Sequence, residues 1–268
     1  MIGSRLSHRL PQLKRADAPR PPFGGRRLAP RVAIATVILL ATLTTGCLQR
    51  FAAGDGATPT GASAGGSPRT ASPAAAPSTG IAGCPTSQPA PLAAGQKRTL
   101  TIATAKGTIV IAIEGALSPI AAGNIVALAG CGWYDGVVFH RLVPGFVIQG
   151  GDGEFGRVGA DGKLADPSRA GKGGPVYRIK DEPVTATYAR GVVAMARSGA
   201  PDSVGSQFFI VLDDQAQGAL ASANTYQIVG KVSSGMDVVD AIAAMPNSGD
   251  PDNAAIDPVP MTKVTVSP

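Results

Sequence analysis

FHRLVPGFVIQGGD, residues 139–152, is the stretch that decides the fold and the chemistry of this chain. One charged residue, Arg141, stands in a run that is otherwise apolar and aromatic. A Pro-Gly turn follows, and then a short apolar segment that carries Gln149 and ends in Gly-Gly-Asp. Because burying a lone charge is costly, we expect Arg141 to line a concave, partly wet surface rather than the core.

The composition indicates one folded domain with extensions. The chain has 268 residues, with 35 Gly, 23 Pro and only 4% aromatic residues, so part of it should be linker. Its net charge of +6 is unevenly placed, because eight of the 24 Lys and Arg but only one of the 18 Asp and Glu lie up to Cys47. The rest is near neutral, which argues against a nucleic-acid-binding face. No Cys-x-x-Cys spacing or His/Cys cluster indicates a metal site, and we expect no cofactor.

Residues 1–47 have the features of an export leader. A basic region precedes an apolar run, residues 32–46, which is shorter than the ~20 residues that span a bilayer. Thr44-Thr45-Gly46-Cys47 resembles a bacterial lipobox with Cys47 as the lipidated residue, although threonine stands where leucine is usual. We therefore expect an exported lipoprotein, tethered to the outer face of the cell membrane. An uncleaved membrane anchor and a soluble secreted protein are the alternatives, and the true start could lie downstream of Met1.

Residues 48–83 are rich in Ala, Gly, Ser, Thr and Pro and predict a disordered linker, which leaves residues 84–268 as the folded domain. If Cys47 carries lipid, Cys84 and Cys131 remain as an even pair. Outside the cytoplasm such a pair is often bonded, so we expect a disulfide between them, with two free thiols as the alternative.

Short alternating segments between turn signals predict a mainly β domain. The expected strands are residues 99–103, 107–114, 137–142, 146–149, 191–195, 207–212, 226–231 and 261–266. One helix is expected from Ser118-Pro119, with the serine as N-cap, to Cys131-Gly132, and a second over 236–244. This pattern predicts a closed β-barrel with a helix at each open end. Residues 153–174 are expected to form a long loop.

Several segments resemble the cyclophilin-type peptidyl-prolyl cis-trans isomerases at that family's spacing. Besides 139–152 they are 106–109, 134–136, 173–182, 191–196 and 205–210, with Asn124 in the first helix. The resemblance runs from about Thr99 to Val266. It implies a closed, eight-stranded, antiparallel cyclophilin-like barrel capped by two helices. It also implies a monomeric enzyme that rotates X-Pro peptide bonds in proline-containing peptides and unfolded protein segments.

By this resemblance, Arg141 is the catalytic residue. An X-Pro bond isomerises slowly unaided, and its nitrogen lone pair becomes an acceptor only at the twisted midpoint. A guanidinium can donate to that nitrogen and so lower the barrier selectively. The expected substrate-binding residues are Phe146, Val147, Phe209 and Leu220 at the proline ring, Gln149, Gln207 and Tyr226 near it, and Ala196, Arg197 and Ser198 along the preceding peptide. Gln149 could hold Arg141 or bond the substrate backbone.

Some residues depart from the family pattern. Arg197 stands where the family often has asparagine and could favour acidic peptides, and Tyr226 takes the place of a common histidine. Phe139 and Phe208 are expected in the core, and His140 is expected to be a barrel residue with its hydrogen bonds satisfied. The alternative function is a non-catalytic peptide-binding or chaperone module that reuses the groove.

Overall fold

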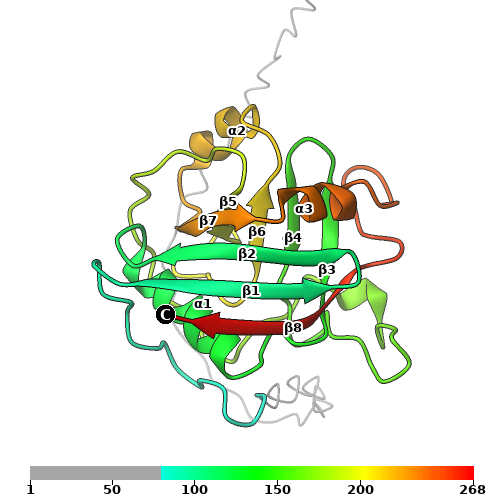
Figure 1. Cartoon of the computed structure of the whole chain (residues 1–268), viewed down its shortest axis with the longest axis horizontal. Helices are drawn as coiled ribbons and strands as arrows, with labels where there is room; N and C mark the ends of the chain where they lie inside the picture. The colour runs from blue at the N-terminus through cyan, green and yellow to red at the C-terminus, as the bar shows by residue number, and fades with distance from the viewer. Residues whose placement is uncertain (1–79) are drawn as a thin grey trace, which may run out of the picture. The chain divides into compact units, whose positions relative to one another are not determined.

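Figure 1 shows the computed structural model, which describes residues 80–268; the expected leader over 1–47 and the linker up to residue 79 lie outside the described residues. The strands are β1 (Lys97–Thr104), β2 (Gly107–Glu114), β3 (Val137–Val143), β4 (Val147–Gly150), β5 (Val192–Met195), β6 (Phe208–Val211), β7 (Ile228–Ser234) and β8 (Pro260–Ser267). They close into one barrel in the order β1-β2-β7-β5-β6-β4-β3-β8. Every neighbouring pair is antiparallel, so the expected eight-stranded barrel is confirmed.

The hairpin of β1 and β2 shows why these residues form strands. Leu100 and Ile102 on β1 and Ile109 and Ile111 on β2 alternate with more exposed residues, and all four are fully buried. This two-residue period places one face of each strand in the barrel. Gly107 ends the turn between the strands with a φ of +132°, a conformation that favours glycine.

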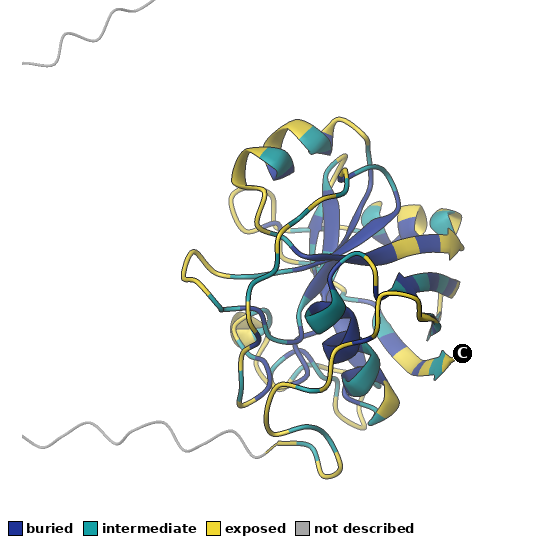
Figure 2. Cartoon of the chain, turned by 90° about the vertical axis from the view of Figure 1, so that its left-hand side faces the viewer, coloured by how far each residue is buried: buried dark blue, intermediate teal, exposed yellow. Residues whose placement is uncertain are grey.

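The helices differ in number from the expectation of two. Helix α1 (Pro119–Gly130) and helix α3 (Met236–Ala243) were expected, but the described residues also contain α2 (Ala216–Ala223) and a 3-10 turn at Pro167–Arg169. Figure 2 shows α2, at the top, as largely exposed. Only Ala216 and Leu220 of this helix are buried. Two buried residues make no extended apolar stripe, so the pattern gave no helical signal.

The start of α1 is capped by a residue that is distant in sequence. Ser118 occupies the N-cap position as expected, but its buried hydroxyl makes no capping hydrogen bond. The carboxylate of Glu182 accepts hydrogen bonds from the backbone N–H groups of Ile120 (2.8 Å) and Ala121 (2.9 Å) instead. A carboxylate is a stronger acceptor than a hydroxyl and complements the positive end of the helix dipole.

Two apolar clusters lie on opposite faces of β4, β5 and β6. The barrel core contains Phe139, Ile148, Val193, Phe208 and Ile210. The second cluster, here called the outer face, contains the residues that alternate with these on β4, β5 and β6, together with Tyr188, two residues of α2 and one of β7. Its buried members are Val147, Tyr188, Val192, Ala194, Phe209, Val211, Ala216, Leu220 and Ile228. Phe139 and Phe208 are thus core residues, as expected.

The segment before β1 is fastened to the barrel. Cys84 and Cys131, 47 residues apart, form a disulfide bond. Leu92 is buried in the barrel core, and its backbone N–H donates to the carbonyl of Pro119 at 2.9 Å. The segment before β1 is therefore attached to both ends of α1, through the disulfide at its end and the hydrogen bond to Pro119 at its start. Within residues 80–268, no helix combines the length and apolar character needed to span a membrane.

Candidate active site

One row of paired residues crosses the outer side of the barrel wall. Arg141 on β3 pairs with Gln149 on β4, Gln149 with Phe209 on β6, and Phe209 with Ala194 on β5. A register shift between Phe139 and Arg141 sets this arrangement. Phe139 pairs with Gly150 and Arg141 with Gln149, so β3 advances by two residues where β4 advances by one. This β-bulge leaves Phe139 in the core and directs Arg141 outward.

Arg141 is half-buried and held by one backbone contact. Its Nε donates to the carbonyl of Asp252 at 3.2 Å. No hydrogen bond among the described residues uses its two Nη groups. No hydrogen bond among the described residues joins the side chains of Arg141 and Gln149, and the NH₂ group of Gln149 donates to Oε1 of Gln207 at 2.9 Å. The guanidinium is therefore anchored at one nitrogen and leaves two for a ligand.

The apolar part of the site is the outer face beside Arg141. Val147, Phe209 and Leu220 are buried members of this cluster, and Phe146 and Tyr226 pack against it. The rings of Phe209 and Tyr226 meet edge to face, with centroids 5.4 Å apart and planes at 84°. Phe146 and Tyr226 lie just outside β4 and β7 rather than within them, and both are partly exposed. The surface thus offers aromatic side chains to a ligand.

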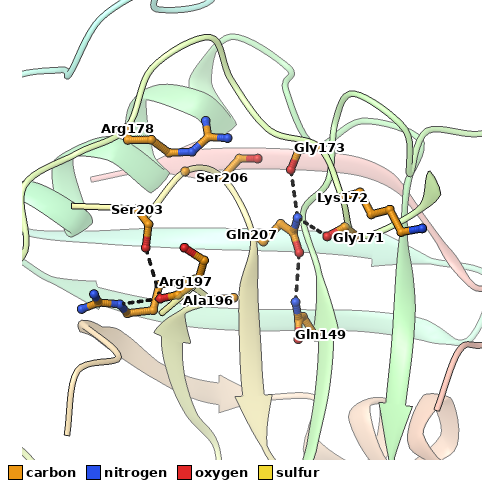
Figure 3. A pocket seen from close by; sticks show the side chains of 12 residues that line it. Gln149, Gly171, Lys172, Gly173, Arg178, Ala196, Arg197, Ser203, Ser206 and Gln207 are labelled. Carbon is orange, nitrogen blue, oxygen red and sulfur yellow. Dashed lines mark hydrogen bonds between the residues drawn. The ribbon is translucent and has the colours of Figure 1, made fainter. Parts of the chain in front are cut away.

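A polar pocket of about 300 Å³ lies next to this row (Figure 3). It is lined by Gln149, Gly171, Lys172, Gly173, Arg178, Ala196, Arg197, Ser198, Ser203, Gly205, Ser206 and Gln207. Ala196 belongs to both regions, because it lines the polar pocket and also packs against the outer face. Gln149 likewise connects the pocket to Arg141 through the strand pairing.

A buried carboxylate fixes the wall of the polar pocket. Asp152 is fully buried, and its Oδ1 accepts from the backbone N–H groups of Glu154 and Phe155, while its Oδ2 accepts from Gly171 and Gly173. The side chain of Gln207 donates to the carbonyls of the same two glycines, each at 2.9 Å. Asp152 therefore closes the 153–174 loop and presents the acceptors that orient Gln207.

Comparison with known proteins identifies the family. The family model described as cyclophilin type peptidyl-prolyl cis-trans isomerase/CLD matches residues 99–266. The chain belongs to the cyclophilin family. A probable peptidyl-prolyl cis-trans isomerase of Brucella abortus is 40% identical over 155 residues, or 56% of this chain and 74% of the relative. A peptidyl-prolyl cis-trans isomerase of Acinetobacter baylyi is 38% identical over 144 residues, or 53% of this chain and 70% of the relative.

Solved cyclophilins share the fold. The crystal structure of a cyclophilin-type isomerase of Cryptosporidium parvum matches with a TM-score of 0.51 and 27% identity, covering 65% of this chain and 99% of that one. A structure of that protein in the presence of the dipeptide Ala-Pro matches with a TM-score of 0.50 and 27% identity, covering 63% and 99%. The chain is thus a peptidyl-prolyl cis-trans isomerase, which accelerates rotation about X-Pro bonds, and the non-catalytic alternative is set aside.

The cyclophilin barrel brings the expected site residues together in two adjoining groups. Phe146, Val147, Phe209, Leu220 and Tyr226 belong to the outer face, while Gln149, Ala196, Arg197, Ser198 and Gln207 line the polar pocket. Arg141 stands at the end of the cross-strand row that joins them.

Arg197 is not the unpaired charge that a preference of this residue for acidic peptides would require. Its side chain is only 9% exposed, and its Nη1 pairs with the carboxylate of Asp181 at 3.0 Å. Its other nitrogens donate to the backbone carbonyls of Ser198 and Ala200. The guanidinium therefore braces the 196–200 turn of the cyclophilin site, and Asp181 neutralises its charge.

His140 is buried, as expected, but it is not satisfied. Its Nδ1 is inaccessible and has no hydrogen-bond partner among the described residues, so that part of the prediction is wrong. Burial lowers the pKa of His140 to about 4, with a smaller lowering from Arg141 and a partly opposing effect of Asp152. A neutral imidazole leaves Arg141 as the charged group at this point of the cyclophilin site.

Sequence reasoning missed three residues of the site. Asp152 ends the motif at 139–152, and a carboxylate placed just before a glycine-rich loop can accept hydrogen bonds from the backbone N–H groups of that loop. Lys172 and Arg178 line the polar pocket but lie in or just after a loop without periodic pattern. Arg178 belongs to the 173–182 segment that resembles the family, but neither its local sequence nor that of Lys172 indicates that its charge lines the pocket.

Proposed function

We propose that Arg141 catalyses the isomerisation of X-Pro bonds in exported polypeptides by donating a hydrogen bond to the prolyl nitrogen. The observation that carries this proposal is the row Arg141-Gln149-Phe209, which sets a guanidinium beside an aromatic surface, with two Nη groups that make no hydrogen bond within residues 80–268. The Nε bond to Asp252 supports the same role, because it restricts the orientation of the guanidinium.

The chemistry needs selective binding of the twisted peptide bond. In the planar cis and trans forms the nitrogen lone pair is delocalised into the carbonyl, and it becomes an acceptor as the bond twists. A donor at the nitrogen therefore stabilises the transition state more than either ground state. One hydrogen bond from a charged group contributes about 1.5–3 kcal/mol, or roughly one to two powers of ten in rate.

The rest of the acceleration comes from holding the proline. Phe146, Phe209 and Leu220 form the apolar surface against which the ring would pack, and Val147 backs it. An oriented, desolvated X-Pro bond reacts faster, because the donor is already in place and water no longer competes for it. Gln149 and Gln207 stand between this surface and the polar pocket, where they can bond the backbone that precedes the proline.

The clients are unfolded, proline-containing segments of exported proteins, reached from the outer face of the membrane. Three features support this part of the proposal. Residues 1–47 carry an export leader that ends at the lipidation candidate Cys47, residues 48–83 have a linker composition, and the folded domain 84–268 contains the Cys84–Cys131 disulfide. Disulfides are rare in reducing compartments, so the pair agrees with an exported domain on a tether.

The catalytic part is tested with a protease-coupled assay, in which the protease cleaves only the trans form of a proline peptide. We expect Arg141→Ala to lower kcat/KM about tenfold to a hundredfold. Arg98→Ala is the matched control, because Arg98 lies on β1 and its Nη1 bonds only the neighbouring carbonyl of Lys97. Unchanged activity of Arg141→Ala, with a melting temperature like that of the wild type, would exclude this role for Arg141.

The location is tested separately in cells. The wild-type chain should partition with membranes, and Cys47→Ala should release it into the soluble fraction. Retention of Cys47→Ala in membranes would refute the lipid anchor and favour an uncleaved apolar leader.

A further inference from the structure

We propose that the polar pocket selects a carboxylate side chain, glutamate or aspartate, on the amino-terminal side of the substrate proline, and that Arg178 and Lys172 provide this selectivity. The proposal rests on the proposed function, because the peptide must lie across the outer face for its preceding residues to reach the pocket. It concerns which substrates are preferred, and it adds no chemical step.

The charge of the pocket lining is one-sided. Three cationic residues line the pocket, Lys172, Arg178 and Arg197, and no acidic residue does. The other lining side chains are serines, glutamines and an alanine, with glycines between them. Such a lining repels a substrate lysine or arginine and gives little apolar surface to a substrate leucine. Electrostatic complementarity therefore favours an anionic side chain.

Two of the three charges remain available to a ligand. Asp181 neutralises Arg197, whereas neither Lys172 nor Arg178 forms an ion pair within residues 80–268. Hydrogen bonds from Ser168 lower the pKa of Asp166, and the charges of Arg169 and Lys172 add smaller contributions. Lys172 thus acts on a carboxylate without forming an ion pair with it.

Arg178 is the better placed of the two. Its Nη1 donates to the carbonyls of Pro175 and Tyr177, which fix the guanidinium at the pocket rim. No hydrogen bond among the described residues uses its Nε or Nη2, so these donors are free for a carboxylate. In Figure 3, Arg178 lies above Ser206, whereas the ammonium group of Lys172 points away from Gln207. The flexible stem of Lys172 allows it to turn toward a bound anion.

The pocket is connected to the place where the bond rotates. Ala196 borders both the pocket and the outer face, and the side chains of Gln149 and Gln207 are hydrogen-bonded to each other at the pocket wall. An extended peptide advances about 3.3 Å per residue. A residue shortly before the proline can therefore place its side chain in the pocket while the proline ring rests on Phe209.

The experiment compares matched peptides that differ only in charge. The full chain is assayed with proline peptides that carry Glu, Gln or Lys two or three residues before the proline. We expect kcat/KM for the better Glu peptide to exceed that of its Gln partner about threefold to fivefold at low salt, the upper part of the range that exposed ion pairs support. The Lys peptide should be the poorest. Raising the salt from about 0.01 M to 1 M, which shortens the Debye length from about 30 Å to about 3 Å, should abolish the difference.

Variants assign the effect to residues. The double variant Lys172→Gln, Arg178→Gln should bring the Glu-to-Gln ratio close to one, and Arg178→Lys should keep part of the preference even if the loss of the Arg178 backbone contacts weakens the fold. Lys106→Gln, at the exposed β1–β2 turn, is the control and should leave the ratio unchanged. A wild-type ratio of one, or a ratio that survives in the double variant, would overturn the proposal. If the wild type still turns over the Gln peptide in these two outcomes, the proposed function stands, and only the selectivity of the pocket for a carboxylate is refuted.

Discussion

Replacing Asp152 by asparagine should weaken the 153–174 loop and, through it, the active site. Asp152 is fully buried and accepts four backbone hydrogen bonds, two on each carboxylate oxygen, at 2.8–3.1 Å. Asparagine keeps the shape but replaces one oxygen with an NH₂ group. Two of the four N–H donors then face another donor and lose their acceptor.

The size of the effect follows from these bonds. Each hydrogen bond to a charged group contributes about 1.5–3 kcal/mol, so two lost bonds correspond to about 3–6 kcal/mol. Because the loop can relax and expose the orphaned N–H groups to water, we expect the lower end, about 3 kcal/mol. For a domain of this size that lowers the melting temperature by roughly 6–12 °C. Because the carbonyls that hold Gln207 lie on the same loop, kcat/KM should fall about threefold to tenfold.

The assay combines thermal unfolding, hydrogen exchange and isomerase activity. Asp152→Asn should speed exchange across 153–173 more than in α1, since the lost bonds belong to the loop. Asp161→Asn is the matched control, because Asp161 is exposed and its Oδ1 accepts only from the N–H of Lys163. Wild-type stability and activity in Asp152→Asn would show that the carboxylate does not hold the loop. Lower stability with wild-type activity would show that the loop does not orient Gln207.

Two further predictions concern Cys84–Cys131 and His140. Reducing the disulfide, or replacing both cysteines with serine, frees a loop of 47 residues and should lower the free energy of unfolding by up to about 4 kcal/mol; an unchanged melting temperature in reductant would contradict this. His140 has a folded-state pKa of about 4, below its unfolded value of about 6.5, so the unfolded chain binds the proton first as the pH falls. Stability should therefore be full above about pH 6.5 and decline by up to roughly 3 kcal/mol toward pH 4. His140→Gln should flatten that part of the unfolding profile, and an equal slope in wild type and variant would exclude His140 as the cause.

The sequence predicted the parts of the fold that depend on local pattern. Alternating apolar residues located the eight strands, with differences at their ends, and the neighbours Phe208 and Phe209 were correctly divided between the core and the outer face. The family motif was needed for that division, because both residues are buried aromatics. Helix α2 was missed, because it buries only Ala216 and Leu220 and has no apolar period.

What sequence could not supply were contacts between distant residues. Ser118 is a good N-cap by type, but Glu182, 62 residues from Ile120, takes that function. Arg197 looked like a free charge, because its partner Asp181 lies on another segment. No local rule gives such pairings, since they depend on how the closed barrel folds its loops over one another.

The bulge in β3 explains how a charged residue can follow a core residue at a two-residue interval. Regular alternation would place Arg141 on the same side as Phe139, which is fully buried in the barrel core. An unpaired guanidinium there would be costly, and the extra residue of the bulge avoids that cost by reversing the phase of the strand. His140 is the extra residue of this bulge, and its buried Nδ1 has no hydrogen-bond partner among the described residues. The outward direction of Arg141, beside Gln149 and Phe209, therefore comes with a buried, uncharged imidazole at the neighbouring position. A change that restored regular pairing at this point would bury Arg141 and remove the site, even if the eight strands still closed.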